Sequence, residues 1–173
     1  MRSTTQHSLF VRVLTGTLAG FVATAPMTAT MEALHDRLPW WQRYPLPPKR
    51  IVNRFLKQVG IRRADTRNFD PLTLAAHASF GAAGGAVYGL VEDSIYVPAP
   101  LKGALFGILV WIVSYMGWIP SADILAPAHK HPRGRRTLMI FSHLVWGAGL
   151  GILTDLLQQA ADQLEEQADA EPA

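Results

Sequence analysis

The sequence predicts an all-α integral membrane protein: a bundle of four transmembrane helices with an amphipathic helix at the cytoplasmic membrane surface. Hydrophobic residues make up 49% of the 173 residues and charged residues only 17%, a balance that favours a bilayer protein. Four apolar segments of about 20 residues each match a hydrocarbon core of about 30 Å. Each of these segments also contains glycines spaced four residues apart.

The glycine spacing predicts how the helices pack. In lipid, two helices associate through close backbone approach, which small residues four apart permit. A soluble helix would lose roughly 1 kcal/mol for each such glycine without a matching gain. The glycines concerned are Gly16, Gly20, Gly81, Gly85, Gly89, Gly103, Gly107, Gly147 and Gly151. They serve packing within the chain or a homo-oligomer, and the sequence leaves both open.

The predicted spans are residues 13–34, 71–91, 101–120 and 138–157, within one domain covering 1–160. A cleaved signal peptide is the alternative for the first span. Its apolar run is longer than a typical signal core, and Pro26 should obstruct cleavage after Ala25, so we expect a retained span. The acidic tail, residues 161–173, is expected to be disordered.

Basic residues predict the topology. Nine Lys and Arg residues lie between residues 35 and 70, four lie between 121 and 137, and only three lie elsewhere. By the positive-inside rule, loops one and three face the cytoplasm and both termini lie on the outer side of a bacterial inner membrane. The net charge of +3 is then a membrane-surface feature, and it gives no reason to expect nucleic acid as a partner.

Residues 49–59 are predicted to form the amphipathic helix. Its apolar positions are Ile51, Val52, Phe55, Leu56 and Val59, which share one helical face. Lys49, Arg50, Arg54 and Lys57 lie off that face and are expected to bind anionic lipid headgroups. The alternative is a short soluble helix packed on the ends of the spans.

The chain also contains an apparent internal repeat. "GTLAG" at Gly16 matches "GALFG" at Gly103, and "HASFGAAGG" from His77 is similar to "HLVWGAGLG" from His143. Spans one and two would then correspond to spans three and four. Two spans per unit leave both units in the same orientation, so this would be a parallel repeat.

Four strings in the chain carry a resemblance to a known family. They are "YPLPPKR" after the first span, "VYGLVED" in the second, "LKGALFGIL" opening the third and "HLVWG" in the fourth. Across residues 13–157 the chain resembles the YagU-like inner-membrane proteins. The resemblance implies a small multi-span protein of the bacterial inner membrane, and it brings no defined reaction, substrate or catalytic residue.

A candidate site is predicted from ionisable side chains inside or beside the spans, because such groups are costly in hydrocarbon and often functional. His77 and His143 lie at similar depth, about 9 Å inside their helices at 1.5 Å per residue. Glu32 and His35 close the first span at the same membrane face, and Asp123 follows the third. These five residues are the candidate proton, ion or ligand site.

Three interpretations of this group remain open. A proton or ion path would use Glu32 together with His77 and His143 around a shared, water-accessible cavity. A haem or metal site would use His77 and His143 as axial ligands, or the single Glu32-x-x-His35 spacing. An interhelical packing role would satisfy each histidine with a neighbour and leave no pocket.

Motifs of soluble enzymes are missing: the sequence has no His-Glu-x-x-His, phosphate loop or Gly-x-Ser-x-Gly elbow, and no cysteine. The favoured hypothesis is therefore a small polytopic inner-membrane protein without intrinsic catalysis, with a structural or accessory role and no firm cofactor. A proton, ion or small-solute transporter, or a pH-responsive protein, is the alternative, and a bis-histidine haem or metal subunit is the second alternative.

Overall fold

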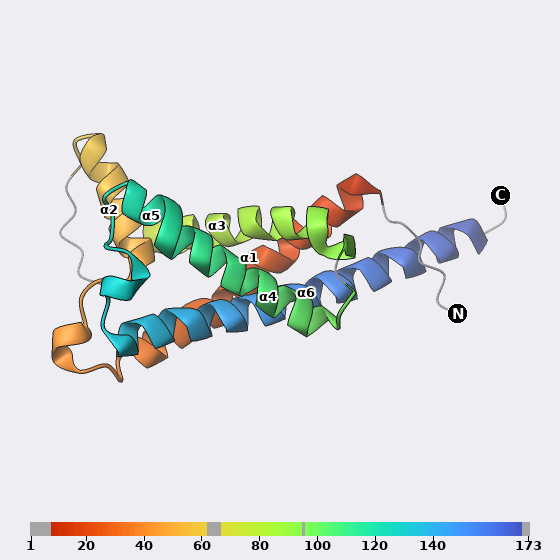
Figure 1. Cartoon of the computed structure of the whole chain (residues 1–173). Coiled ribbons are helices and arrows are strands. Elements are labelled where there is room, and N and C mark those ends of the chain that lie inside the picture. The colour runs from red at the N-terminus through yellow and green to blue at the C-terminus, as the bar shows by residue number, and fades with distance from the viewer. Residues whose placement is uncertain (1–7, 62–66, 95, 171–173) are drawn as a thin grey trace.

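The computed structural model describes residues 8–61, 67–94 and 96–170, and in these ranges the chain is helical with no strand (Figure 1). The elements are α1 (Leu9–His35), α2 (Pro47–Gln58), α3 (Pro71–Val91), α4 (Ala99–Ile112), η3 (Val113–Trp118), α5 (Ile119–Ser121) and α6 (Arg133–Ala170), with short 3₁₀ turns at Trp40–Gln42, Glu92–Ser94 and Ala128–Lys130. Four segments are long and apolar enough to cross a membrane: Leu9–His35, Pro71–Val91, Ala99–Ser121 and Arg133–Ala168. The prediction of a four-span helical membrane protein is confirmed to that extent.

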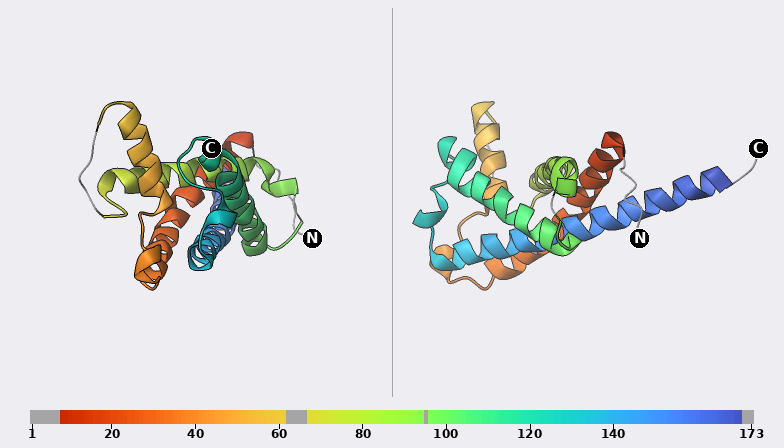
Figure 2. Two further views of the ribbon diagram at one scale, coloured as in Figure 1. Left: turned by 60° about the vertical axis from the view of Figure 1, so that its left-hand side comes forward. Right: turned by 45° about the vertical axis from the view of Figure 1, so that its right-hand side comes forward.

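The four long helices pack in the order α3, α1, α6, α4. α1 lies against both α3 and α6, and α4 lies against α6, whereas α3 and α4 make few contacts with each other (Figure 2). The arrangement is therefore an open row with three strong interfaces. The side between α3 and α4 is left without a glycine-mediated interface.

The glycines build two of these interfaces inside the chain. A side chain added to Gly16 or Gly20 of α1 would overlap backbone atoms of Gly85 or Gly81 in α3. The same is true across α4 and α6, where Gly103 meets the carbonyl oxygen of Gly147. Gly89, Gly107 and Gly151 are also in close backbone contact with a neighbouring helix, at Arg12, His143 and Ala99. In this structure the glycines lie at helix contacts within the chain, so they give no separate argument for a homo-oligomer.

The third span is not a regular helix. Its second half, η3, is π-helical, and Gly117 departs from helical dihedral angles with φ −108° and ψ −106°. Pro120, three residues later, lacks the N–H that would continue the α-helical ladder and crowds the preceding turn. The helix widens and bends at this point. The bend moves η3 and α5 away from the glycine seam, by which we mean the contact that Gly103 and Gly107 of α4 make with α6.

Helix α2 and the two basic loops lie at the end of the molecule opposite the start of α1 and the end of α6 (Figure 1). Arg135 fixes the first loop there: it donates to the carbonyl oxygens of Gln42, Tyr44 and Pro45 at 2.7–3.2 Å. Its guanidinium also stacks 3.7 Å from the Tyr44 ring centroid. Arg62 and Arg63, counted in the topology prediction, lie outside the described residues.

The assignment of Lys49 to lipid headgroups is wrong. Its side chain is only 3% exposed, and its ammonium lies 3.0 Å from the Asp70 carboxylate, which is fully buried. Asp70 also caps α3 by accepting from the Thr73 backbone N–H and hydroxyl. Lys49 therefore holds α2 against the start of α3. Arg50, Arg54 and Lys57 are exposed, as a headgroup-binding surface requires.

One boundary expectation also differs from the structure. α6 continues through Ala170, so residues 161–170 are helical where a disordered tail was expected; the segment is rich in Ala, Gln, Glu and Leu, which favour helix even when exposed. Phe55 and Val59 of the amphipathic stretch are 65% and 58% exposed, as an apolar face turned toward a membrane surface would be.

Candidate functional site

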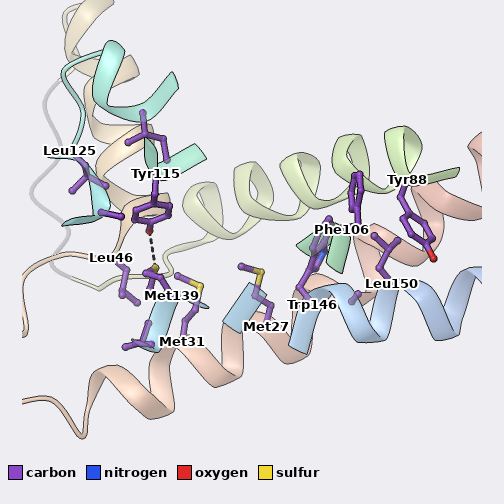
Figure 3. Packing of buried hydrophobic residues seen from close by; sticks show 14 of the residues in the cluster. Met27, Met31, Leu46, Tyr88, Phe106, Tyr115, Leu125, Met139, Trp146 and Leu150 are labelled. Atoms are coloured by element: carbon purple, nitrogen blue, oxygen red, sulfur yellow. Dashed lines mark hydrogen bonds between the residues drawn. The ribbon is translucent and has the colours of Figure 1, made fainter. Parts of the chain in front are cut away.

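An apolar cavity of about 160 Å³ lies between the spans beneath α2. Its walls come from α1, α2, α3, α4, η3, α5 and α6, so nearly every element contributes. Met27 and Met31 of α1 and Met139 of α6 lie along one side, and Figure 3 shows these three side chains near Tyr115 of η3. Methionine is flexible and polarisable, and it lets such a wall adapt to the shape of an occupant.

The polar part of the lining is small. Among the described residues of the wall, side-chain hydroxyl groups come from Thr24, Ser114 and Tyr115. Thr24 donates to the Gly20 carbonyl and Tyr115 donates to the Met139 sulfur at 2.7 Å, whereas Ser114 accepts from the Trp118 indole and keeps its own proton. The two histidines therefore dominate the hydrogen-bonding character of the cavity.

His77 is fixed by α1. Its Nδ1 lies 3.1 Å from the Thr28 hydroxyl oxygen, and Phe69 stacks on its ring with centroids 5.5 Å apart. The Thr28 hydroxyl proton is directed to the Thr24 carbonyl oxygen at 2.8 Å. Because that oxygen is then the acceptor, the imidazole Nδ1–H is the donor. This assignment leaves a lone pair on Nε2 of the neutral ring.

His143 reaches the same protonation pattern by a different route. Its Nδ1 lies 2.8 Å from the Met139 carbonyl oxygen one turn earlier in α6. A carbonyl oxygen only accepts, so Nδ1–H of His143 is the donor and Nε2 carries the lone pair. In the part of the chain that the structure describes, Nε2 of neither histidine has a protein hydrogen-bond partner. The prediction that each histidine is satisfied by a neighbour holds for one nitrogen of each ring.

The cavity is not fully enclosed. Phe80 of α3 and Trp118 of η3 both line it, yet they are 45% and 37% exposed on the outer surface. Their ring centroids are 6.1 Å apart, so the two rings are in contact with each other. Pro47, Pro48, Ile51 and Val52 of α2 cover the cavity at the end of the molecule.

The structure brings His77 and His143 together but not the other three candidates. Glu32 is exposed and lies outside the cavity lining. His35 is buried, with Nε2 3.3 Å from the Tyr44 carbonyl oxygen, and its Nδ1 lies 3.7 Å from the Asp36 carboxylate. Asp123 is exposed in the following loop, with a φ of 54°. The proton path through Glu32 is therefore not assembled in this structure.

The residues do not fit a haem. A cavity of about 160 Å³ is close to the roughly 150 Å³ site known to hold one benzene molecule. A haem macrocycle contains four pyrrole rings and is far larger. The Glu32-x-x-His35 spacing also fails to form a metal site, because Glu32 is exposed and both His35 nitrogens lie against local partners. Among the described residues, no three His, Asp or Glu side chains gather as a metal site would need.

Sequence reasoning missed most of the cavity wall. The i, i+4 pairs Met27/Met31 and Met139/His143 place two side chains of each helix on one face, and this spacing is readable from the chain. The Gly117 and Pro120 pair near the end of an apolar run was the available sign of an irregular helix. Neither sign shows that the bend would open a space between helices.

A second polar cluster lies at the other end of the spans, around Glu92. Glu92 is 6% exposed; it accepts from Lys102 at 2.7 Å and from Gln158 at 2.9 Å. Burial opposes ionisation of Glu92, but these hydrogen bonds and the Lys102 charge outweigh it and hold the pKa of the carboxyl below its ordinary value. Arg12 pairs with the neighbouring Asp93 at 3.0 Å. The cluster ties α3, α4 and α6 together.

No protein-family model, no curated protein and no solved structure matches the chain. The resemblance to YagU-like proteins therefore stays a prediction. What can be said of function rests on the fold and on the cavity.

Proposed function

We propose that this is a small inner-membrane protein that binds a lipophilic molecule, or the ring-sized part of one, in the cavity between its spans. The observation that supports this proposal is the cavity itself: it is apolar, it lies between the four candidate spans, and it is not fully enclosed. A purely structural role predicts that this space is filled by side chains. The role is accessory in the sense that the protein carries or senses its ligand without transforming it.

The proposal also draws on the topology. With loops one and three in the cytoplasm, α2 lies at the inner leaflet and covers the cavity from that side, and both termini lie outside. Arg50, Arg54 and Lys57 then face anionic headgroups. A periplasm-active reporter fused after the last residue should be active, and an inactive but well-expressed fusion would reverse this orientation.

The binding proposal is tested with a photoreactive, diazirine-bearing toluene analogue and the protein in lipid nanodiscs. We expect cross-links on peptides of the cavity wall, mapped by mass spectrometry. Val110→Trp fills the cavity from α4 and should abolish these cross-links, because Val110 is part of the lining. Val113→Trp is the matched control, since Val113 is 54% exposed and outside the lining.

Two results would count against the proposal. Cross-links spread evenly over all lipid-facing side chains, including those of Phe21 and Leu105, would show that the probe merely dissolves in the bilayer around the protein. Cross-links at the cavity wall that persist in a folded Val110→Trp protein would place the probe elsewhere.

A further inference from the structure

We infer that the cavity selects a hydrogen-bond donor: the occupant is the hydroxyl-bearing ring of a lipophile, a phenol or hydroquinone, bound through the Nε2 atoms of His77 and His143. This inference rests on the proposed function and names the chemical class that it leaves open. Both rings donate their only N–H to an acceptor within the protein: His77 to the Thr28 hydroxyl oxygen and His143 to the Met139 carbonyl oxygen.

The direction of the hydrogen bonds follows from that use. Each neutral ring offers the cavity one lone pair and no proton. A carbonyl compound or an ether brings only acceptors, so it would leave both nitrogens unsatisfied in apolar surroundings. A hydroxyl group brings the missing proton. Two acceptors in one small space suit a ring with one or two hydroxyl groups better than any acceptor-only group of similar shape.

The other polar groups of the wall do not change this direction. The Thr24 hydroxyl donates to the Gly20 carbonyl and the Tyr115 hydroxyl donates to the Met139 sulfur. The indole N–H of Trp146 is also occupied, by the Gly20 carbonyl at 3.2 Å, and that of Trp118 by Ser114. The donors of these four residues are thus used within the protein. Ser114 accepts from Trp118 and keeps its own hydroxyl proton, so the wall offers two imidazole lone pairs and one hydroxyl donor.

The size and walls of the space argue for a ring. About 160 Å³ accommodates a single six-membered ring. Phe80, Tyr115, Trp118 and Trp146 contribute aromatic walls, which pack well against the face or edge of another ring. Because the cavity is not fully enclosed, an alkyl substituent on the ring can extend out of it toward the bilayer. The ligand is thus an amphiphile whose polar group is buried and whose tail remains in lipid.

The experiment compares three ligands of nearly equal shape as competitors of the toluene photolabel in nanodiscs: 4-ethylphenol, its methyl ether 4-ethylanisole, and ethylbenzene. Concentrations in the bilayer are measured, so that differences in partitioning are removed. We expect the phenol to compete about five- to tenfold better than the ether and the hydrocarbon, which corresponds to one or two net hydrogen bonds.

Variants of the two histidines test whether His77 and His143 cause the preference for the phenol. His77→Phe and His143→Phe keep a ring but lose the acceptor, and each should reduce the advantage of the phenol about three- to tenfold while toluene labelling persists. His129→Phe is the matched control, because His129 is exposed in the loop and outside the lining. Size-exclusion profiles and toluene labelling confirm that each variant is folded.

The outcomes separate the inference from the proposed function. If toluene labels the cavity but phenol and ether compete equally, the donor-selection inference is wrong and the binding function stands. If the phenol retains its advantage in both folded histidine variants, the acceptors lie elsewhere and the inference is also wrong. If toluene never labels the cavity, the binding function itself fails. Should a variant not fold, the comparison of phenol with ether in the unmodified protein still decides.

Discussion

Single polar residues fix the helices of this protein where apolar packing alone would not. Lys49 reaches from α2 to the buried Asp70 at 3.0 Å, and Arg12 reaches from α1 to the carbonyl oxygens of Gly89 and Leu90 at the end of α3. These contacts join segments that are far apart in the chain. Removing one partner leaves a buried charge or a helix end without its hydrogen bonds, which costs more than the contact itself contributes.

Lys49→Met should destabilise the protein by about 3–5 kcal/mol, because it removes the Lys49 ammonium from its contact with the buried Asp70 carboxylate. The measurement is the SDS mole fraction at half unfolding, followed by circular dichroism. Arg54→Met is the control, since Arg54 is exposed on the same helix and its loss should change stability by no more than about 0.5 kcal/mol. Equal effects of the two substitutions would contradict the buried role of Lys49.

Glu92 should make stability depend on pH in a defined direction. Its folded pKa lies below the ordinary value of 4.5, so its contribution is fully present above that value and is lost as the pH falls through the folded pKa. At neutral pH, Glu92→Gln should cost about 1–2 kcal/mol. That difference should shrink as the pH falls below 4.5, measured by thermal unfolding in detergent. Glu165→Gln, on the exposed end of α6, should show no such trend; a constant difference for Glu92→Gln would contradict the assignment.

At the scale of elements, the glycine seams and the bend in the third span act together. The seams bring α1 against α3 and α4 against α6 with backbone atoms in contact. Past Gly107, the irregular η3 segment departs from α6, and Tyr115 and Trp118 form the cavity wall. Interruptions of this type are frequent at functional sites in helices. The cavity thus exists because one helix follows the close-packed path for only part of its length.

Gly147→Ala and Gly149→Ala test the seam on one helix. A methyl group at position 147 overlaps the Gly103 carbonyl oxygen, so α4 and α6 must separate, and we expect a loss of about 1–3 kcal/mol. At position 149 the added methyl group meets only the Ala23 Cβ at 3.5 Å, an ordinary contact, and the better helix propensity of alanine should stabilise by up to about 1 kcal/mol. Midpoints of SDS unfolding measure both, and a reversed order would refute the seam.

At the scale of the whole molecule, the positions of the helices along the chain are well predicted from the sequence, and the distances between neighbouring helices are poorly predicted. The four spans and the glycine contacts follow from composition and spacing, because both properties are local. The burial of Lys49 depends on Asp70, which is 21 residues away, and periodicity within α2 alone places Lys49 at the surface. The cavity depends on how far the bend near Gly117 carries η3 from α6, which no local pattern encodes.

The candidate site shows the same division. The equal depth of His77 and His143 followed from counting residues, and both line one cavity. Sequence reasoning places Glu32 with them because it lies at the same membrane face. Depth does not specify the direction in which a helix turns its side chains, however, and Glu32 is exposed.

The parallel repeat stays a prediction. Gly16 contacts Gly85 and Gly89, and its counterpart Gly103 contacts Gly147 and Gly151. In the proposed repeat, Gly147 and Gly151 correspond to Gly81 and Gly85, so the contacts of the two units differ by one helical turn.

The open row of helices has a consequence for how the polypeptide can be divided. Because α3 and α4 share so little surface, a break in the chain near residue 97 would leave two fragments, each containing its own glycine-packed helix pair. Co-expressed as residues 1–97 and 98–173, they should associate in the membrane through α1 and α6 and copurify on a tag carried by one of them. Gln158 and Lys102 of the second fragment would meet Glu92 of the first, so Glu92→Gln should weaken the split protein more than the intact one. The protein would then consist of two helical hairpins that can associate without a covalent connection.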